Sequence, residues 1–370
     1  MIQTFSSTIR RKEMDAVLTC MVDEKTGPGE LNTRLIQAVK ECTGCDGAVA
    51  FRSATIALSY ALRALDLPLE SEIMISALAP AWQYSAVVSL GYKPMVLDVQ
   101  EETGLVTAQI VEEGIKSGGR LLLLHETMGV VPELEKIAAL GIPLIEDISH
   151  SFGAVVEPQQ DEESSETAQK PVAKNVGSFG VYAIMGMEEF DTITAGGGAV
   201  LMAPRRREWS ALKSFTDAAP RTDILPDINS ALAFVQIKEF RRNEDIRETI
   251  YASFQHALLS GKNKTFAREH GEGSTIWSFP VVLAGSVKDA KQYAGRKDIE
   301  IRLAYEDSVI ALLEKISASD DMEQANKAAE IVAPCKKAKA LFLRTVLFPL
   351  YPRLGSEAVT KITKVLGTLP

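Results

Sequence analysis

The chain has 370 residues, of which 46% are hydrophobic and 24% are charged; this composition is ordinary for a folded protein and excludes a wholly disordered one. No run approaches the roughly 20 apolar residues of a membrane span, and residues 1–20 lack the apolar core of a secretory signal. We therefore expect a cytoplasmic protein that does not contact a membrane. The net charge of −9 argues against nucleic-acid binding, because such proteins usually carry a basic patch.

Four cysteines in so long a chain do not make a disulfide framework. Cys42 and Cys45 form a C-x-x-C pair, but they follow an expected helix over 31–41 that Gly44 ends. Reactive pairs usually lie at helix N-termini, and a zinc site would need a second ligand pair. We interpret both cysteines as structural and expect no metal site.

Short apolar strands alternate with helices between residues 47 and 149. Strands are expected at 47–51, 72–78, 94–99, 121–125 and 142–148, and helices at 53–65, 82–90, 108–116 and 132–140. This alternation predicts an α/β fold with a mainly parallel sheet covered on both faces. Such sheets bind ligands at the carboxyl ends of their strands, where we expect Ser53, Asp98, His125 and Asp147.

An acidic, polar segment over 157–175 interrupts this pattern. We expect a surface loop there, with a lid over the site as the alternative. Further strands are expected at 176–185 and 197–202, then one long helix over 229–259. The C-terminal part is expected to hold a strand at 276–283 and helices at 322–331 and 356–366. At roughly 150 residues per domain, these elements predict a large α/β domain over 1–240 and a smaller α+β domain over 241–370.

Two short groups of residues point to a ligand. The small residues Ser53, Ala54 and Thr55 lead into an expected helix whose first backbone N–H groups would suit an anion; taken alone, these residues are explained more simply by plain N-capping. Asp147 ends a buried strand, with His150 three residues on. Such a carboxylate either holds a protonated ring nitrogen or caps the following turn, and a metal would require more ligands at matched spacing.

Six segments in this order resemble the DegT/DnrJ/StrS-type sugar aminotransferases, which have the fold type I architecture of pyridoxal phosphate enzymes. They are 50–65, 72–98, 125–129, 145–154 ("IEDISHSFGA"), 196–200 and 348–354 ("FPLYPRL"). The resemblance covers almost the whole chain. It implies a large, mainly parallel-sheet domain with a smaller C-terminal α+β domain, a homodimer and a sugar-nucleotide ligand.

The resemblance also implies roles for individual residues. Ala54 and Thr55 match positions that bind the cofactor phosphate, and Trp82 matches the aromatic that stacks on the pyridine ring. Asp147 matches the carboxylate paired with the pyridinium nitrogen, and His150 the position beside the ring's phenolic oxygen. The alternatives are a buried core aromatic for Trp82 and a buried, backbone-bonded histidine for His150.

The catalytic lysine of the family has no match in this chain. That lysine forms the Schiff base and then moves the proton, and it stands about eight residues before the second glycine of a Gly-Glu-Gly-Gly strand. Counting back from Gly198 reaches Phe190, with Glu189 and Glu188 in the neighbouring registers, and residues 176–207 contain no lysine. Ala183 replaces the phosphate-binding serine that precedes the lysine in the family.

Three interpretations follow. We favour a non-transaminating pseudoenzyme that binds a cofactor, a nucleotide sugar or a partner. The second is a lysine-independent sugar dehydratase-like enzyme that uses pyridoxamine phosphate, with Glu188 or Glu189 as a base whose pKa is raised by burial; a solvated surface is the alternative for this pair. The third is an active aminotransferase whose lysine comes from elsewhere, such as Lys174. Pyridoxal phosphate or pyridoxamine phosphate would be held non-covalently in the first two, and the first also allows no cofactor.

Overall fold

The computed structural model describes residues 1–157, 173–268 and 274–370. In these ranges the helices are α1 (Arg11–Val22), α2 (Glu30–Thr43), α3 (Ala54–Leu65), α4 (Ala81–Ser89), α5 (Ala108–Lys116), a 3-10 turn (Thr127–Gly129), α6 (Leu134–Ala138), α7 (Arg206–Thr216), α8 (Asp227–Lys238), α9 (Phe240–Leu258), α10 (Val287–Gly295), α11 (Val309–Ser317), α12 (Met322–Val332), α13 (Lys336–Arg344) and α14 (Ser356–Leu366). The strands are β1 (Gly47–Phe51), β2 (Glu72–Ser76), β3 (Lys93–Leu97), β4 (Leu121–His125), β5 (Leu144–Asp147), β6 (Val155–Val156), β7 (Lys174–Asn175), β8 (Tyr182–Gly186), β9 (Ala199–Ala203), β10 (Phe279–Val282), β11 (Arg302–Leu303) and β12 (Thr345–Phe348). Most of the acidic segment that we expected to be a loop or lid lies outside the described residues.

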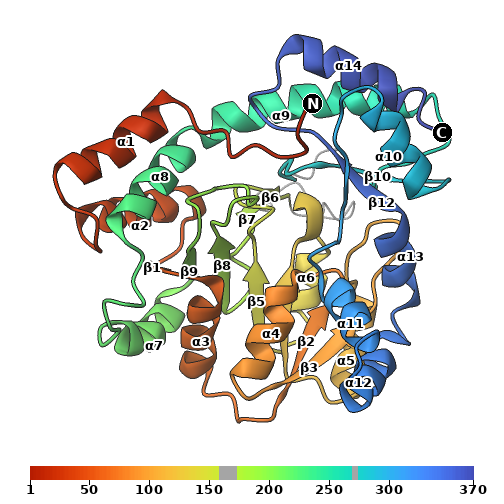
Figure 1. The fold of residues 1–370 in the computed structure, drawn as a ribbon. Coiled ribbons are helices and arrows are strands. Elements are labelled where there is room, and N and C mark those ends of the chain that lie inside the picture. Colours follow the sequence, from red (N-terminus) through yellow and green to blue (C-terminus); the bar gives the residue numbers. More distant parts are fainter. Residues whose placement is uncertain (158–172, 269–273) are drawn as a thin grey trace, which may run out of the picture.

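A mixed sheet of seven described strands forms the centre of the molecule, in the order β1-β9-β8-β5-β4-β2-β3 (Figure 1). Neighbouring strands from β3 to β8 are parallel, and β9 alone is reversed, since it runs antiparallel to both β8 and β1. The mainly parallel α/β fold is therefore confirmed. The strands on either side of β9 point the same way, so the loops after β1, β2, β4, β5 and β8 meet at one edge of the sheet.

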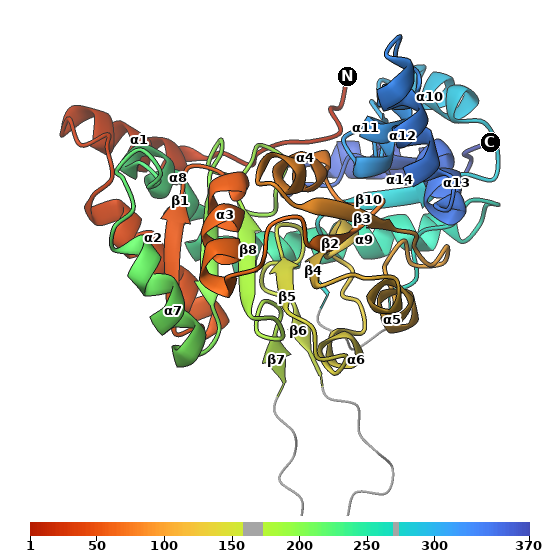
Figure 2. The same cartoon turned by 90° about the horizontal axis from the view of Figure 1, so that it is seen from below.

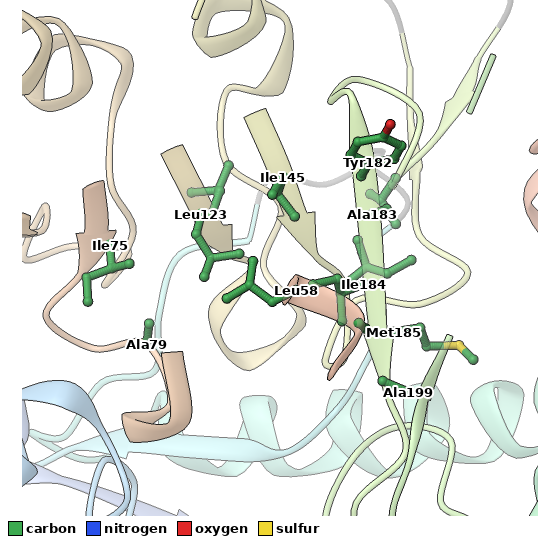
Figure 3. Packing of buried hydrophobic residues seen from close by; sticks show 14 of the residues in the cluster. Leu58, Ile75, Ala79, Leu123, Ile145, Tyr182, Ala183, Ile184, Met185 and Ala199 are labelled. Carbon is green, nitrogen blue, oxygen red and sulfur yellow. The ribbon is translucent and has the colours of Figure 1, made fainter. Parts of the chain in front are cut away.

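The central strands are buried along their whole length and mostly apolar, because helices cover both faces of the sheet. All five residues of β4 and all five of β8 are buried. Leu58 of α3 packs among Leu123, Ile145 and Ile184 of three adjacent strands (Figure 3). Burying one such side chain contributes about 1.5–3 kcal/mol, so this cluster fixes α3, and with it the turn at its N-terminus, against the sheet.

A second, antiparallel sheet in the order β10-β12-β11 has a hydrophobic core of its own. Phe254 of α9, Phe279 of β10 and Ile362 of α14 belong to this core. The second sheet, α10 and α14 group on one side of the large sheet, and α1 and α2 lie at the opposite edge (Figure 2). Separate cores agree with two domains, but the division at residue 240 stays a prediction.

The single long helix expected over 229–259 is wrong. The chain forms α8 and α9 instead, and the break is at Glu239, whose φ of −93° and ψ of 0° leave the helical region. The two helices need different directions, because α8 packs against α1 and α2 whereas α9 packs against α14. Neither glycine nor proline marks the break, so the apolar periodicity by itself predicts one continuous helix.

Local capping explains several helix ends that were expected from the sequence. Ser53 Oγ accepts the N–H of Ile56 at 3.2 Å, and Gly44, with a φ of 75°, ends α2. Cys42 and Cys45 are free thiols, and burial raises the pKa of both, which agrees with a structural role. None of the helices in the described ranges combines the length and apolar character needed to cross a bilayer.

Candidate functional site

A cavity of about 330 Å³ lies where the carboxyl ends of the parallel strands face the second sheet. Loops of the large sheet supply one side of it, and the segment around β11 supplies the other. Its described lining consists of Ser53, Ala54, Thr55, Leu78, Pro80, Trp82, His125, Thr127, Met128, Ser149, His150, Gly186, Glu188, Phe190 and Asp191, facing Phe5, Trp277, residues 302–308 and Leu347.

Most residues predicted from the sequence line this one cavity. They are Ala54, Thr55, Trp82, His150 and Glu188. Asp147 lies beneath the lining, and Glu189 lines a smaller hollow beside the cavity. Asp98, which we expected at the same edge, is elsewhere: it accepts the backbone N–H groups of Lys337 and Ala338 and caps α13.

The N-terminus of α3 forms the anion-binding end of the cavity. The first intrahelical hydrogen bond of α3 runs from Ala57 N–H to Ser53 O at 3.1 Å. The N–H groups of Ala54 and Thr55 precede that bond, so they need another partner, and both residues line the cavity. Their N–H groups and the helix dipole together suit a phosphate or carboxylate. Capping by Ser53 and anion binding are therefore compatible here.

Trp82 stands in the first turn of α4 and is half-buried, with part of its surface on the cavity. The chain around it is tied to the second sheet's side of the cavity. Ala81 N–H donates to Asp307 O at 2.8 Å, and Pro80 forms a bridge with Ser308. Trp82 thus offers its indole to a ring-shaped ligand and also packs against the core.

Asp147 is fully buried, and protein donors fill its carboxylate. Oδ2 accepts Gln83 Nε2–H at 2.7 Å and His125 Nδ1–H at 3.0 Å. Oδ1 accepts the backbone N–H of Ser149 at 3.2 Å and also its hydroxyl. Burial by itself would raise the pKa of Asp147, but the charge of His125 and these hydrogen bonds outweigh it and lower the pKa.

His150 stands between this carboxylate group and the cavity. Its Nδ1 lies 3.2 Å from His125 Nε2, and its ring stacks on Trp277 with centroids 3.7 Å apart and planes at 14°. Burial, followed by the charge of His125, lowers the pKa of His150 well below its ordinary value. His150 is therefore a neutral imidazole bonded to another side chain, and among the described residues it has no bond to a backbone carbonyl.

Phe190, where the gap-free count places the family's lysine, packs against the other side of the cavity. Its ring stacks on Phe5 with centroids 4.6 Å apart, and the Arg302 guanidinium lies 5.5 Å from its centroid. Its carbonyl accepts the indole N–H of Trp277 at 2.6 Å. The described lining contains no lysine. Lys174 lies on β7, away from that lining, where it pairs with Glu135 at 3.5 Å.

A family model for the DegT/DnrJ/EryC1/StrS aminotransferases matches residues 7–367. The chain belongs to this family.

Solved structures share the fold over the whole length of the chain. The aminotransferase TlmJ from Streptoalloteichus hindustanus is 17% identical, with a TM-score of 0.80 over 100% of this chain and 98% of that one. The sugar aminotransferase CalS13 from Micromonospora echinospora is 13% identical, with a TM-score of 0.81 over 100% of both chains. Spr1654 from Streptococcus pneumoniae, solved in a PMP form, is 16% identical, with a TM-score of 0.82 over 98% of this chain and 95% of that one. These similarities establish fold type I architecture.

PMP and PLP forms among the family's structures make pyridoxal phosphates the cofactor class to test against this cavity. The residues here fit that group at one end only. Ala54, Thr55 and Trp82 suit a phosphate and a ring face. At the other end the Asp147 carboxylate already accepts four hydrogen bonds from the protein, and no described lining residue supplies an amine for a Schiff base. The described lining therefore offers contacts for a phosphate and a ring, but no amine.

The burial expected for Glu188 or Glu189 is not found, and their role as a base stays a prediction. Both residues are exposed. The carboxyl of this loop with little exposure belongs to Asp191, which lines the cavity and whose side chain is 14% exposed. Burial raises the pKa of Asp191 to about 8, although the backbone N–H of Glu188 opposes this shift. The sequence shows only an acidic residue after Phe190, with no sign of its burial.

Glu126, next to His125 at the end of β4, is a fully buried carboxyl outside the cavity lining. Ser151 and Glu146 are its polar neighbours, and neither of its oxygens has a hydrogen-bond partner of good geometry in the described part of the chain. Burial, and then the charge of Glu146, raise the pKa of Glu126 well above its ordinary value. The folded protein therefore keeps a proton here that the unfolded chain releases above about pH 4.3.

Stability should fall as pH rises through this range, because the unfolded state binds fewer protons than the folded state. We expect Glu126→Gln, which cannot ionise, to raise the free energy of unfolding near pH 8 by about 1–3 kcal/mol and to reduce its decline from about pH 5. Urea unfolding at the two pH values measures both effects. Glu330→Gln, at an exposed glutamate of α12, is the control; equal pH dependence in the two variants would contradict the prediction.

Proposed function

We propose that this chain is a non-transaminating member of the aminotransferase family that binds a phosphorylated small molecule non-covalently in its cavity. The observation that supports this proposal is the composition of the described lining. It includes the N-terminus of α3 at Ala54 and Thr55, and it contains no lysine. Binding an anion requires only the N–H groups and the dipole of α3. Transamination requires a primary amine for the Schiff base.

The ligand class follows from the two ends of the cavity. A phosphate suits the N-terminus of α3, and a flat ring suits the face of Trp82. Pyridoxal phosphate, pyridoxamine phosphate and nucleotide sugars all carry a phosphate group and a ring. We expect a homodimer, as the family resemblance implies, and α1 leaves the apolar side chains of Met14, Leu18 and Met21 exposed for such contact.

A second candidate function is a lysine-independent, dehydratase-like reaction with pyridoxamine phosphate. The observation that favours it is Asp191, a buried carboxyl that faces the cavity beside the neutral His150. A carboxyl whose pKa lies near neutrality can give or take a proton under working conditions. This candidate moves the acid–base role from Glu188 or Glu189 to Asp191.

The test is titration of the purified protein with pyridoxal phosphate and, separately, with pyridoxamine phosphate. We expect each ligand to raise the melting temperature, because it binds the native state, and we expect no aldimine absorbance band with the aldehyde. Borohydride reduction followed by peptide mapping should find no lysine labelled at one equivalent. Phe190→Lys, which restores an amine at the cavity, is the positive control for the band.

Two results would overturn the proposal. One equivalent of label on a single lysine, such as Lys174, would support an active aminotransferase with a displaced nucleophile. Failure of both ligands to raise the melting temperature would remove the phosphate-binding role and leave a partner-binding protein. Label spread thinly over surface lysines is background, and a specifically labelled lysine must exceed it.

A further inference from the structure

The carboxyl group of Asp191 occupies a built position at the cavity wall. Its Oδ2 accepts the N–H of Glu188 at 2.7 Å and lies against Gly186, where a Cβ would come within 2.7 Å of it. The same Cβ would lie 2.8 Å from Ser149 Oγ. A side chain at residue 186 would thus displace the Asp191 carboxyl. Because Gly186 has no side chain, Asp191 can lie over the end of β8.

The second oxygen of Asp191 has no hydrogen-bond donor among the described residues. His150 Nε2 is the near polar atom, at 3.9 Å from Oδ1, which exceeds hydrogen-bonding distance. Both side chains are only 14% exposed, and both line the cavity. A ligand in the cavity therefore meets a carboxyl oxygen that the protein leaves unpaired.

The charges around Asp191 come from every element packed against it, and they are mixed in sign. They are Glu188 on its own loop, Asp147 and His150 after β5, His125 at the end of β4, Arg247 of α9 in the adjoining hollow, and Arg302 of β11 across the cavity. Arg247 pairs with Glu244 at 3.4 Å, and Arg302 pairs with Glu306. Both cations thus have other carboxylates as partners, while Asp147 and Glu188 disfavour a third negative charge.

We propose that Asp191 is a specificity-determining residue of the cavity, whose carboxyl group forms a hydrogen bond with an acceptor on the ligand through the oxygen that the described residues leave unpaired. This inference rests on the proposed function, because it assigns the contact made by the end of the ligand away from α3. A lysine at this wall would present a permanent cation, whereas a protonated carboxyl is neutral. The cavity then prefers a carbonyl or hydroxyl oxygen at this point over an ammonium group.

Pyridoxal phosphate and pyridoxamine phosphate are matched probes of this preference. They share the phosphate and the ring, but the aldehyde oxygen accepts a hydrogen bond and the protonated amine only donates. Calorimetry one pH unit below and one above the value of about 8 for Asp191 compares the two affinities in each state. We expect the preference for the aldehyde to weaken by about tenfold across this range, since an ionised carboxylate attracts the ammonium group.

Asp191→Asn is the matched variant, because an amide keeps a donor of similar shape and cannot ionise. We expect it to bind both probes with a ratio that does not change with pH beyond the titration of the probes themselves. Binding of the probes with the same pH swing in wild type and variant overturns the role of Asp191 and leaves the proposed function intact. Failure of both probes to bind wild type overturns the proposed function, and this inference with it.

If Asp191→Asn does not fold, a measurement on the ligand-free wild-type protein still tests the inference. In ¹⁵N-histidine spectra of the wild-type protein, the His150 ring should report a titration with its midpoint near the value of about 8 for Asp191, because Oδ1 lies 3.9 Å from Nε2. A His150 ring that is insensitive to pH between about 7 and about 9 overturns the inference.

Discussion

A glutamate in place of Thr55 is expected to weaken the binding of pyridoxal phosphate or pyridoxamine phosphate by on the order of 100-fold. Thr55 lies in the first turn of α3 and lines the anion-binding end of the cavity. A carboxylate there competes with the ligand's phosphate for the same N–H groups and repels its charge. The fold should not suffer, because an acidic residue in the first turn of a helix contributes about 0.3–1 kcal/mol of stability.

Thr55→Gln is the matched control for this substitution, since glutamine has nearly the same size as glutamate and carries no charge. Calorimetric titration of both variants, together with their melting temperatures in the absence of ligand, separates lost binding from lost folding. Equal affinities for the two variants would mean that the ligand's phosphate does not reach the N-terminus of α3. The anion-binding end would then have to be sought elsewhere in the molecule.

Asp147→Ala is expected to lower the free energy of unfolding by about 3–5 kcal/mol. The substitution removes a carboxylate that accepts four hydrogen bonds, and it leaves Gln83, His125 and Ser149 as buried donors without partners. Asp98→Ala, which removes the cap of α13, is expected to cost about 0.5–2 kcal/mol. Denaturant unfolding of both variants near neutral pH makes the comparison, and a loss for Asp147→Ala no larger than for Asp98→Ala would contradict the prediction.

The pH dependence of the same variant has a defined sign. The pKa of Asp147 is lowered in the folded state, so its contribution to stability is present above its unfolded value of about 3.9 and is lost as pH falls through the folded value. Asp147→Ala lacks this pH-dependent contribution to stability. The gap in stability between wild type and variant should therefore shrink when unfolding is repeated below about pH 4.

Local features of the fold could be predicted from the sequence because neighbouring residues decide them. The cap at Ser53 and the stop at Gly44 follow from the residue types at the helix ends. The helix over Ser356–Leu366 follows from the spacing of its own apolar residues. The break at Glu239 could not be predicted in this way. It depends on which distant helices α8 and α9 pack against, and that information is tertiary.

The candidate site divides along the same line. Ala54, Trp82 and His150 could be expected together, because loops that follow parallel strands meet at one edge of the sheet. The low exposure of Asp191 could not be expected, since it depends on how the loop after β8 folds back to place the carboxyl against Gly186. Asp98 shows the converse error. It lies at the expected strand end, but its carboxylate caps α13, a helix more than 200 residues later in the chain.

The pairing of Ile2 with the segment just before β11 has a consequence for biosynthesis. Ile2 N–H donates to Asp298 O at 2.7 Å, Glu300 N–H donates to Ile2 O at 2.9 Å, and Phe5 nearby lines the cavity. A ribosome must therefore have released about four-fifths of the chain before its earliest residues can find their partners. Until then Phe5 and Phe190 lack the opposing wall, so a ligand cannot assist the nascent chain and can act only on a nearly finished one.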